Sequence, residues 1–216
     1  MKKLLISSAV LFMLSCNNDK KDTVSSSSAD TSKMASADKP ADTAQAPVPD
    51  SATMMKAWQA YMTPGDAHKM IAKSNGKWEE EVKMYMNPGA PPEVMKSTCE
   101  NTMIMNGLYQ YSVTKGNYNG MPFEGHNTLG FNNATKKYQS TWIDNMGSGM
   151  MNMQGTWDST SKMVVMTGFE TDMISGKDMP VRETMKFTDD NHQTLEMFET
   201  RGGKESKTME INYKRL

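Results

Sequence analysis

The sequence has little cysteine, little histidine and almost no net charge. Of its 216 residues two are Cys and three are His, while 24 Lys and Arg nearly balance 25 Asp and Glu. Two thiols cannot build a disulfide-dense mini-protein or a four-thiolate zinc site. A formal charge of −1 lacks the basic footprint of a nucleic-acid-binding protein, so we expect no nucleic-acid partner. With 9 Pro and 15 Gly, the composition also excludes a collagen-like chain.

The residue present in excess is methionine, which accounts for 24 of the 216 positions. Twenty-one of these fall within residues 51–216, spread over almost every strand-like segment and the helices. Flexible thioethers can fill an irregular core or line an adaptable cavity. They also select Cu(I), so copper handling is a second interpretation of the same residues. The broad spread favours a general replacement of Leu, Ile and Val, and we expect no cofactor, with Cu(I) as the alternative.

The first sixteen residues resemble a bacterial lipoprotein signal. Lys2 and Lys3 precede the apolar stretch 4–14, which is too short to cross a hydrocarbon core of about 30 Å as a helix. Met13-Leu14-Ser15-Cys16 is similar to a lipobox, with Met13 where Leu is usual. The resemblance implies cleavage before Cys16 and lipid attachment to its sulfur, and an ordinary secretory signal is the alternative. We therefore expect a membrane partner through Cys16 and a cell-envelope location, at the outer membrane.

The composition divides the chain into three segments. Residues 1–15 are the expected signal peptide. Residues 16–50 begin with the lipidated Cys16 and continue as a Ser, Ala, Asp and Pro-rich tether without aromatic residues, a composition that cannot bury enough apolar surface to order itself. The remaining 166 residues, 51–216, suit one domain with its own core.

The domain is expected to begin with two short helices and to continue as strands. Ser51 is a candidate cap for a first helix with one apolar face, and Thr63-Pro64 for a second helix ending at Gly76. The apolar period then changes to two, which is typical of half-buried strands. The expected runs are 78–86, 103–113, 121–131, 136–145, 150–157, 162–170, 180–188, 193–200 and 206–214. Strands at this spacing, separated by turn residues, predict a mainly β fold, an antiparallel meander barrel of about 8–10 strands under an N-terminal helical lid.

An ordered set of short motifs resembles the bacterial domain-of-unknown-function family 1579 over residues 63–216. The family implies a calycin or lipocalin-like barrel, with no established activity or catalytic residues. Phe131-Asn132 departs from its pattern, which favours an aromatic hydroxyl and an acid there. The motifs are Pro64-Gly65, His68-Lys69, Gly76-Lys77-Trp78, Pro122-Phe123-Glu124-Gly125, Leu129-Gly130-Phe131, Tyr138 to Met146, Gly176-Lys177, Arg182-Glu183, Glu196-Met197, Gly203-Lys204-Glu205 and Met209-Glu210-Ile211.

No catalytic motif is legible, and we lean against an enzyme. The sequence has no nucleophile elbow, Walker loop or dinucleotide fingerprint. The three histidines have no metal-ligand spacing: His68 is expected on a polar helix face, His126 on the same strand face as Glu124, and His192 in a solvated turn. Cys99 is expected to be a small buried hydrophobe.

The first interpretation is a non-catalytic barrel that binds a small hydrophobic or amphipathic ligand. The residues expected to line the cavity are Met105, Tyr111, Phe123, Trp142, Met153 and Phe187, with Asp144 and Arg182 as polar contacts. It is equally open that Asp144 caps a turn and that Arg182 lies outside. A barrel filled by its own side chains, serving as a structural or interaction module of the envelope, is the alternative. The sequence does not indicate an oligomeric state.

Overall fold

The computed structural model describes residues 48–87 and 89–216. The chain divides into two compact units, Met1–Pro47 and Val48–Leu216, and only the second lies within the described residues. The expected signal peptide, Cys16 and all but the last three residues of the expected tether fall outside them.

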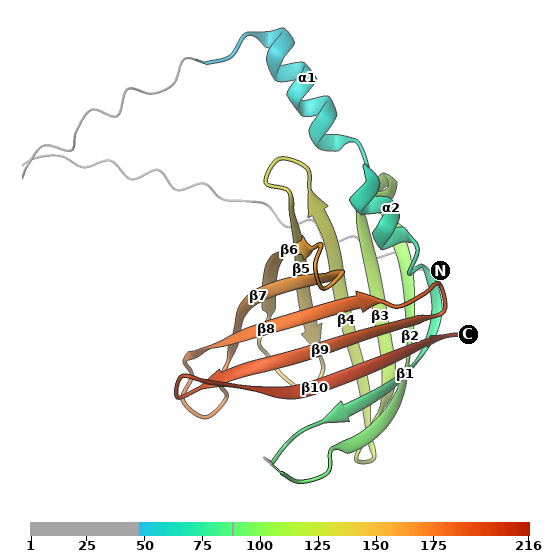
Figure 1. Cartoon of the computed structure of the whole chain (residues 1–216), viewed down its shortest axis with the longest axis vertical. Helices are drawn as coiled ribbons and strands as arrows, with labels where there is room; N and C mark the ends of the chain where they lie inside the picture. The colour runs from blue at the N-terminus through green and yellow to red at the C-terminus, as the bar shows by residue number, and fades with distance from the viewer. Residues whose placement is uncertain (1–47, 88) are drawn as a thin grey trace, which may run out of the picture. The chain divides into compact units, whose positions relative to one another are not determined.

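Ten antiparallel strands form a closed barrel, each strand pairing with its neighbours in sequence and β1 closing the sheet against β10 (Figure 1). Closure pairs the edges that a ten-stranded open sheet would expose. The predicted meander barrel is therefore confirmed. The strands are β1 Gly76–Met84, β2 Glu93–Ile104, β3 Tyr109–Tyr118, β4 Met121–Asn132, β5 Lys137–Asp144, β6 Met151–Asp158, β7 Met163–Thr171, β8 Asp178–Phe187, β9 His192–Arg201 and β10 Lys204–Arg215.

Two helices precede the barrel, and their first residues differ slightly from the prediction. Helix α1, Ser51–Met62, is capped by Asp50 rather than Ser51, because the Asp50 carboxylate accepts the Thr53 amide N–H at 2.9 Å. Helix α2, Asp66–Ala72, starts after Gly65, whose amide N–H donates to Nδ1 of His68 at 3.0 Å. Every residue of α1 is exposed, so its apolar face takes no part in the barrel core. Neither described helix has the length and apolarity to cross a bilayer.

The run 103–113, predicted as one strand, is two strands joined by a tight turn. Strand β2 ends at Ile104, a 3₁₀ turn η1 covers Met105–Gly107, and β3 begins at Tyr109. Met105, Asn106 and Gly107 all have positive φ, a conformation that Asn and Gly adopt readily. Apolar residues alternate in the sequence on both sides of this turn, so the two-residue period alone does not reveal the turn. Strand β2 itself was absent from the predicted set.

The core lies at the end of the barrel covered by α2, which we call the α2 end. Ile71 of α2 is fully buried and α2 contacts β3 and β4, so this helix supplies the expected lid. The main apolar cluster joins Ile71 to inward-facing residues Leu129, Tyr138, Met153, Val164, Met166 and Val181. Because the ten strands, the two helices and this core all lie within the compact unit 48–216, we expect that segment to fold on its own.

Candidate binding site inside the barrel

The inner face of the barrel has two chemically different halves. Residues in register across neighbouring strands share a face, so the pairing assigns each alternate side chain to the inside. Strands β1 to β5 carry most of the buried polar groups of this face, set among apolar residues such as Trp78, Val82 and Leu129. We call these polar groups the polar arc: Glu80, Ser97, Cys99, Asn101, Gln110, Ser112, Thr114, Asn127 and Ser140. Strands β6 to β10 place mostly apolar groups, the methionine arc: Met151, Met153, Val164, Met166, Met179, Val181, Met185, Leu195, Met197, Met209 and Ile211.

Glu80 is the centre of the polar arc. Its side chain is 2% exposed and accepts hydrogen bonds from the hydroxyls of Ser97 and Thr114, the latter at 3.3 Å. Burial raises the pKa of Glu80, and the hydroxyl hydrogen bonds oppose that shift because they stabilise the charged form. The neighbouring Cys99 thiol lies 3.1 Å from Oδ1 of Asn101, and burial, together with the charge of Glu80, raises its pKa to about 12. Cys99 is buried, as the sequence predicts.

Glu183 brings a second carboxyl group into the barrel, but from the methionine arc. It pairs in register with Met166 and Met197 and is 7% exposed. Among the described residues no hydrogen bond or ion pair involves its carboxyl group, whose oxygens keep some accessible surface. Burial alone raises the pKa of Glu183 to about 7. A carboxyl group in this setting is available to a polar group from outside the chain.

Tyr213 of β10 is the neighbour of Glu80 on the inner face. It faces Glu80 across the β1–β10 pair and packs edge-on against Trp78, with ring centroids 6.5 Å apart. Burial, followed by the negative charges of Glu80, Cys99 and Glu183, raises the pKa of the Tyr213 hydroxyl well above its usual value. Tyr213 nevertheless keeps part of its surface accessible.

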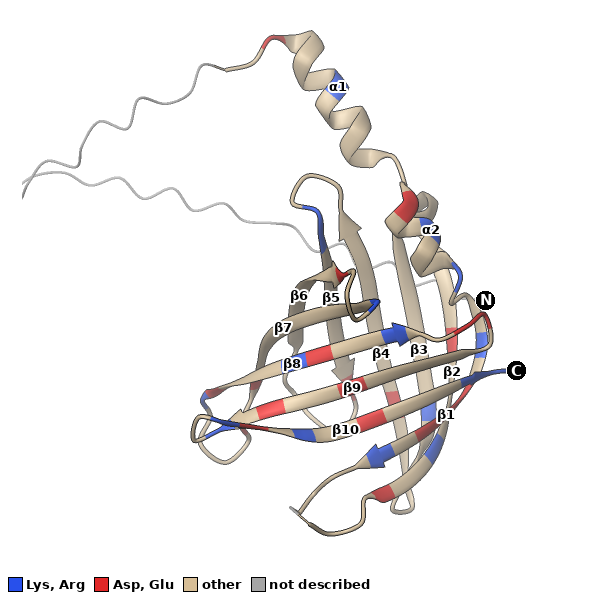
Figure 2. Cartoon of the chain, viewed as in Figure 1, with Lys and Arg blue, Asp and Glu red and all other residues tan. Residues whose placement is uncertain are grey.

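The end opposite α2 carries an aromatic and charged rim. Phe123 and Trp142 stack with centroids 6.3 Å apart, and the Trp142 indole N–H donates to Asp144 at 2.7 Å. Arg201 bridges the carboxylates of Asp172 and Glu199 at 2.7 and 3.0 Å. Beside them, burial and the charge of Glu199 raise the pKa of Glu170 to about 7. Charged residues of both signs also mark the strands away from this rim (Figure 2).

The structure brings together some of the predicted cavity residues and separates others. Phe123, Trp142 and Asp144 form the rim, and Met153 and Phe187 pack in or against the core near α2. Asp144 also accepts the backbone N–H of Met146, which is the turn-capping role considered as its alternative.

Three predicted cavity residues lie outside the barrel interior. Met105 is 69% exposed in the turn after β2. Tyr111 faces outward and contacts Nδ1 of His126 at 2.6 Å. Arg182 is also on the outer face, where its guanidinium group makes two hydrogen bonds to Glu205 and covers the Phe198 ring at 3.9 Å. The expected pairing of Asp144 with Arg182 therefore does not occur.

The histidines occupy three different environments. His68 is 1% exposed instead of lying on a polar helix face, because the α2 turn directs it toward Phe131, and burial lowers its pKa. The Phe131 carbonyl partly opposes that shift but forms no hydrogen bond of normal geometry with Nε2. His126 lies 2.9 Å from Glu124 on the same face, as expected. His192 is exposed beside Asp189. The described residues contain no cluster of three or more His, Cys, Asp or Glu suited to a metal ion.

The two inner carboxyl groups were not recognised in the sequence as site residues, although a signal was present. Glu80 shares the alternating positions of Trp78 and Val82, and Glu183 those of Val181 and Met185. A single acid on an otherwise apolar strand face is an unusual burial, since charged groups are rarely buried without a partner. Tyr213 gave no such signal, because an aromatic residue on an apolar face is ordinary.

A closed ten-stranded antiparallel barrel with a helix at one end is a lipocalin-like barrel. Within that class, the chain belongs to the family of proteins of unknown function DUF1579, whose family model matches residues 63–215. This family membership confirms the resemblance found in the sequence.

Solved structures with the same fold have low sequence identity. Rv2717c from M. tuberculosis shares 10% identity with a TM-score of 0.52, covering 71% of this chain and 99% of that one. The S-type phycobiliprotein lyase CPES from Guillardia theta shares 12% identity with a TM-score of 0.51, covering 69% and 92% respectively. These similarities establish the fold alone. A comparison with curated proteins gives no match.

Proposed function

We propose that the barrel is a non-catalytic module that binds a small amphipathic molecule on its inner face. The observation that carries this proposal is that residues facing inward are only half-buried, including Met197, Met209, Ile211 and Tyr213. In a barrel filled by its own side chains these inward positions would be fully buried. The polar and methionine arcs would then contact the polar and apolar parts of one ligand.

A neutral fluorescent probe, N-phenyl-1-naphthylamine, tests this proposal on the folded segment 48–216. We expect saturable binding with a gain in fluorescence. Met209→Trp adds bulk to the inner face and should weaken binding about tenfold, because an occupied volume excludes the probe. The matched Met173→Trp change, at a loop position that is 94% exposed, should leave binding unchanged. Absence of saturable binding, or equal binding by both variants, would contradict the proposal.

We also propose that the protein is a lipoprotein of the cell envelope, anchored through Cys16. The support is the sequence 2–16, with its positive start, short apolar stretch and lipobox-like end. In cells supplied with an alkyne-bearing fatty acid, the full chain should be labelled and recovered with membranes. Cys16→Ser should lose the label. An unlabelled full chain would contradict the anchor.

Copper handling remains the alternative for the methionines, because the methionine arc places Met153 of β6, Met166 of β7 and Met197 of β9 on one inner wall. Competition for Cu(I) against a chromogenic chelator tests it in the segment 48–216. Binding of one Cu(I) per chain that is lost in Met166→Leu would support copper handling, and no binding above the chelator background would remove it.

A further inference from the structure

The inner face of the barrel has an excess of acidic groups over available cations. Two arginines point inward, and both are already engaged. Arg201 bridges Asp172 and Glu199 at the rim. Arg215, at the α2 end, covers the Trp78 ring at 4.2 Å and donates to the carbonyls of Lys73, Asn75 and Asp190. Among the described residues, neither Glu80 nor Glu183 forms an ion pair.

The carboxyl groups of Glu80 and Glu183 differ in the number of hydrogen bonds that the chain donates to them. Two hydroxyl groups donate to Glu80, so part of its hydrogen-bonding capacity is used. Glu183 receives no hydrogen bond from any described residue, although it is more than nine-tenths buried and points inward between Met166 and Met197. Leaving a buried acidic group without a partner is costly, and such groups are retained where a ligand supplies the partner.

We propose that the molecule bound inside the barrel is an amphipathic amine, whose protonated nitrogen pairs with Glu183 and whose apolar body lies against the methionine arc. This inference rests on the proposed binding function and specifies its ligand class. Tyr213 and Glu80, which pair in register on β10 and β1, offer further acceptors on the same inner face for N–H groups of the ligand. Thioethers suit the apolar body because their flexible chains adapt to its shape.

The charged groups of the inner face favour a cationic ligand over an anionic or a neutral one. An anionic ligand would meet Glu80 and Glu183 with no free cation beside them, since Arg201 and Arg215 are engaged and Lys204, which shares the face of Arg201, lies exposed at the rim. A neutral ligand could occupy the methionine arc but would leave the Glu183 carboxyl group with at most a neutral hydrogen bond. A charge-assisted hydrogen bond is roughly twice as strong as a neutral one.

Three amphiphiles with the same apolar chain test the head-group preference: dodecylamine, dodecanol and dodecanoate. Each displaces N-phenyl-1-naphthylamine from the segment 48–216 near neutral pH. We expect dodecylamine to displace the probe at a concentration about tenfold below that of dodecanol, with dodecanoate the weakest, because only the amine forms a charge-assisted bond. Glu183→Gln should reduce the preference for the amine to about threefold or less. Glu100→Gln makes the same change on the exposed outer face of β2 and should keep the full preference.

The outcomes separate this inference from the function on which it rests. If the probe binds but all three amphiphiles displace it equally, or dodecanoate displaces it best, the amine inference is overturned and the binding function stands. If the probe does not bind, the binding function itself fails. The wild-type comparison needs no variant, so it decides the inference even if Glu183→Gln does not fold. An amine preference that persists in a folded Glu183→Gln variant would also overturn the assignment of Glu183.

Discussion

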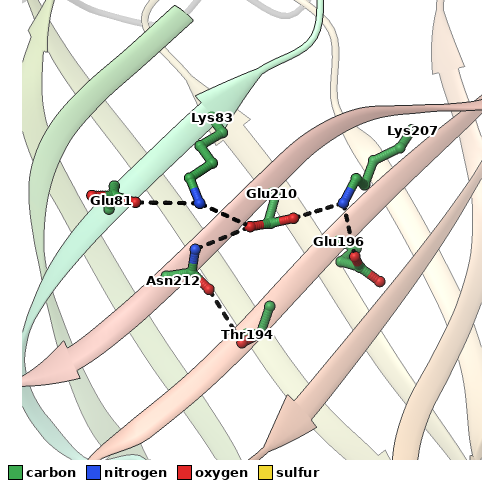
Figure 3. A network of polar contacts seen from close by, with 7 residues as sticks. All are labelled: Glu81, Lys83, Thr194, Glu196, Lys207, Glu210 and Asn212. Atoms are coloured by element: carbon green, nitrogen blue, oxygen red, sulfur yellow. Dashed lines mark hydrogen bonds and ion pairs between the residues drawn. The ribbon is translucent and has the colours of Figure 1, made fainter. Parts of the chain in front are cut away.

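Lys207 and Glu210 form an ion pair of 2.6 Å although they lie three residues apart on one strand, β10 (Figure 3). In a regular strand, residues at this spacing point to opposite faces. The register shifts between Lys207 and Met209, so the extra residue of a β-bulge, Thr208, brings both charges to the outer face. Glu210 also receives Lys83 of β1 at 3.2 Å, and Lys207 contacts Glu196 of β9 at 3.0 Å. The network therefore joins three strands.

Glu210→Gln should destabilise the barrel at neutral pH. Hydrogen bonding, first from Lys207, holds the pKa of Glu210 at about 2, below its ordinary value of 4.5. A lowered folded-state pKa contributes stability above pH 4.5 that is lost as the pH falls toward 2. Allowing for partial solvent screening, we expect a loss of about 1–2 kcal/mol in the free energy of unfolding. Urea unfolding at several pH values measures it, with Glu100→Gln as the control. A difference that persists near pH 2 would exclude this ionic origin.

Glu183→Gln should have the opposite pH dependence. Burial raises the pKa of Glu183 to about 7, so the folded state binds its proton more tightly than the unfolded state does. Stability from this group is present below pH 4.5 and is lost as the pH rises through about 7. As the pH rises from 4.5 to about 7, the free energy of unfolding of the variant should increase relative to that of the wild type by up to about 3 kcal/mol.

The titration of Glu183 must be separated from that of its neighbours. Glu80 and Tyr213 face it inside the barrel, and Glu170 at the rim also has a pKa raised to about 7. Because these groups are common to both proteins, the difference between wild type and variant in urea unfolding isolates Glu183 to first order. A difference that does not change between acidic and alkaline pH would contradict a raised pKa for Glu183.

Gly155→Ala should disrupt the barrel wall. Gly155 faces inward on β6, and a Cβ added there would lie 1.8 Å from the Val165 carbonyl oxygen and 2.6 Å from the Met166 Cα of β7. Both are backbone atoms, so the strand pair itself would have to move. We expect the free energy of unfolding to fall by about 3 kcal/mol or more, because the added methyl group overpacks the strand pair. Gly149→Ala is the matched control, since a Cβ there meets nothing within 4 Å. Thermal unfolding that is equal for both variants would contradict this close approach.

Cys99 should resist alkylation in the folded protein. The thiol is 5% exposed, and its pKa is raised to about 12, so almost no thiolate is present at moderately alkaline pH. Iodoacetamide should label the segment 48–216, in which Cys99 is the sole cysteine, only after denaturant is added. Mass spectrometry measures the label. Rapid modification without denaturant would show that the polar arc opens on the timescale of the reaction.

Local patterns predicted most of the strands because alternation and turn residues act within a few positions. The segments around β4 to β10 were located from such signals. The predicted run 103–113 failed because the turn at Met105–Gly107 leaves the alternation of its neighbours uninterrupted. The bulge at Thr208 was invisible for a related reason, since it depends on pairing with the neighbouring strand and leaves no turn residues in the sequence.

The candidate site was harder to predict than the fold. Trp142 and Asp144 could be linked from sequence because they are two residues apart on one strand. Arg182 could not be placed, since a long charged side chain fits either face of a half-buried strand and the nearby Glu205 lies on a different strand. Glu80 and Tyr213 face each other only because closure pairs β1 with β10, strands from opposite ends of the domain, whereas Glu183 reaches the inner face from β8.

The sequence by itself determined the strand-rich domain, the family and the abundance of methionine, because composition and periodicity are local properties. The expected general replacement of Leu, Ile and Val by methionine does not extend to the most buried positions, where Ile, Leu and Val outnumber Met. Tertiary structure alone decided what those methionines face. The closed barrel places the methionine arc and the polar arc on the two sides of one interior. It also buries Glu183 on the inner face without a partner among the described residues. The physical reason is that a side chain's electrostatic environment depends on strands that are distant in sequence, and pairing register sets which of them it meets.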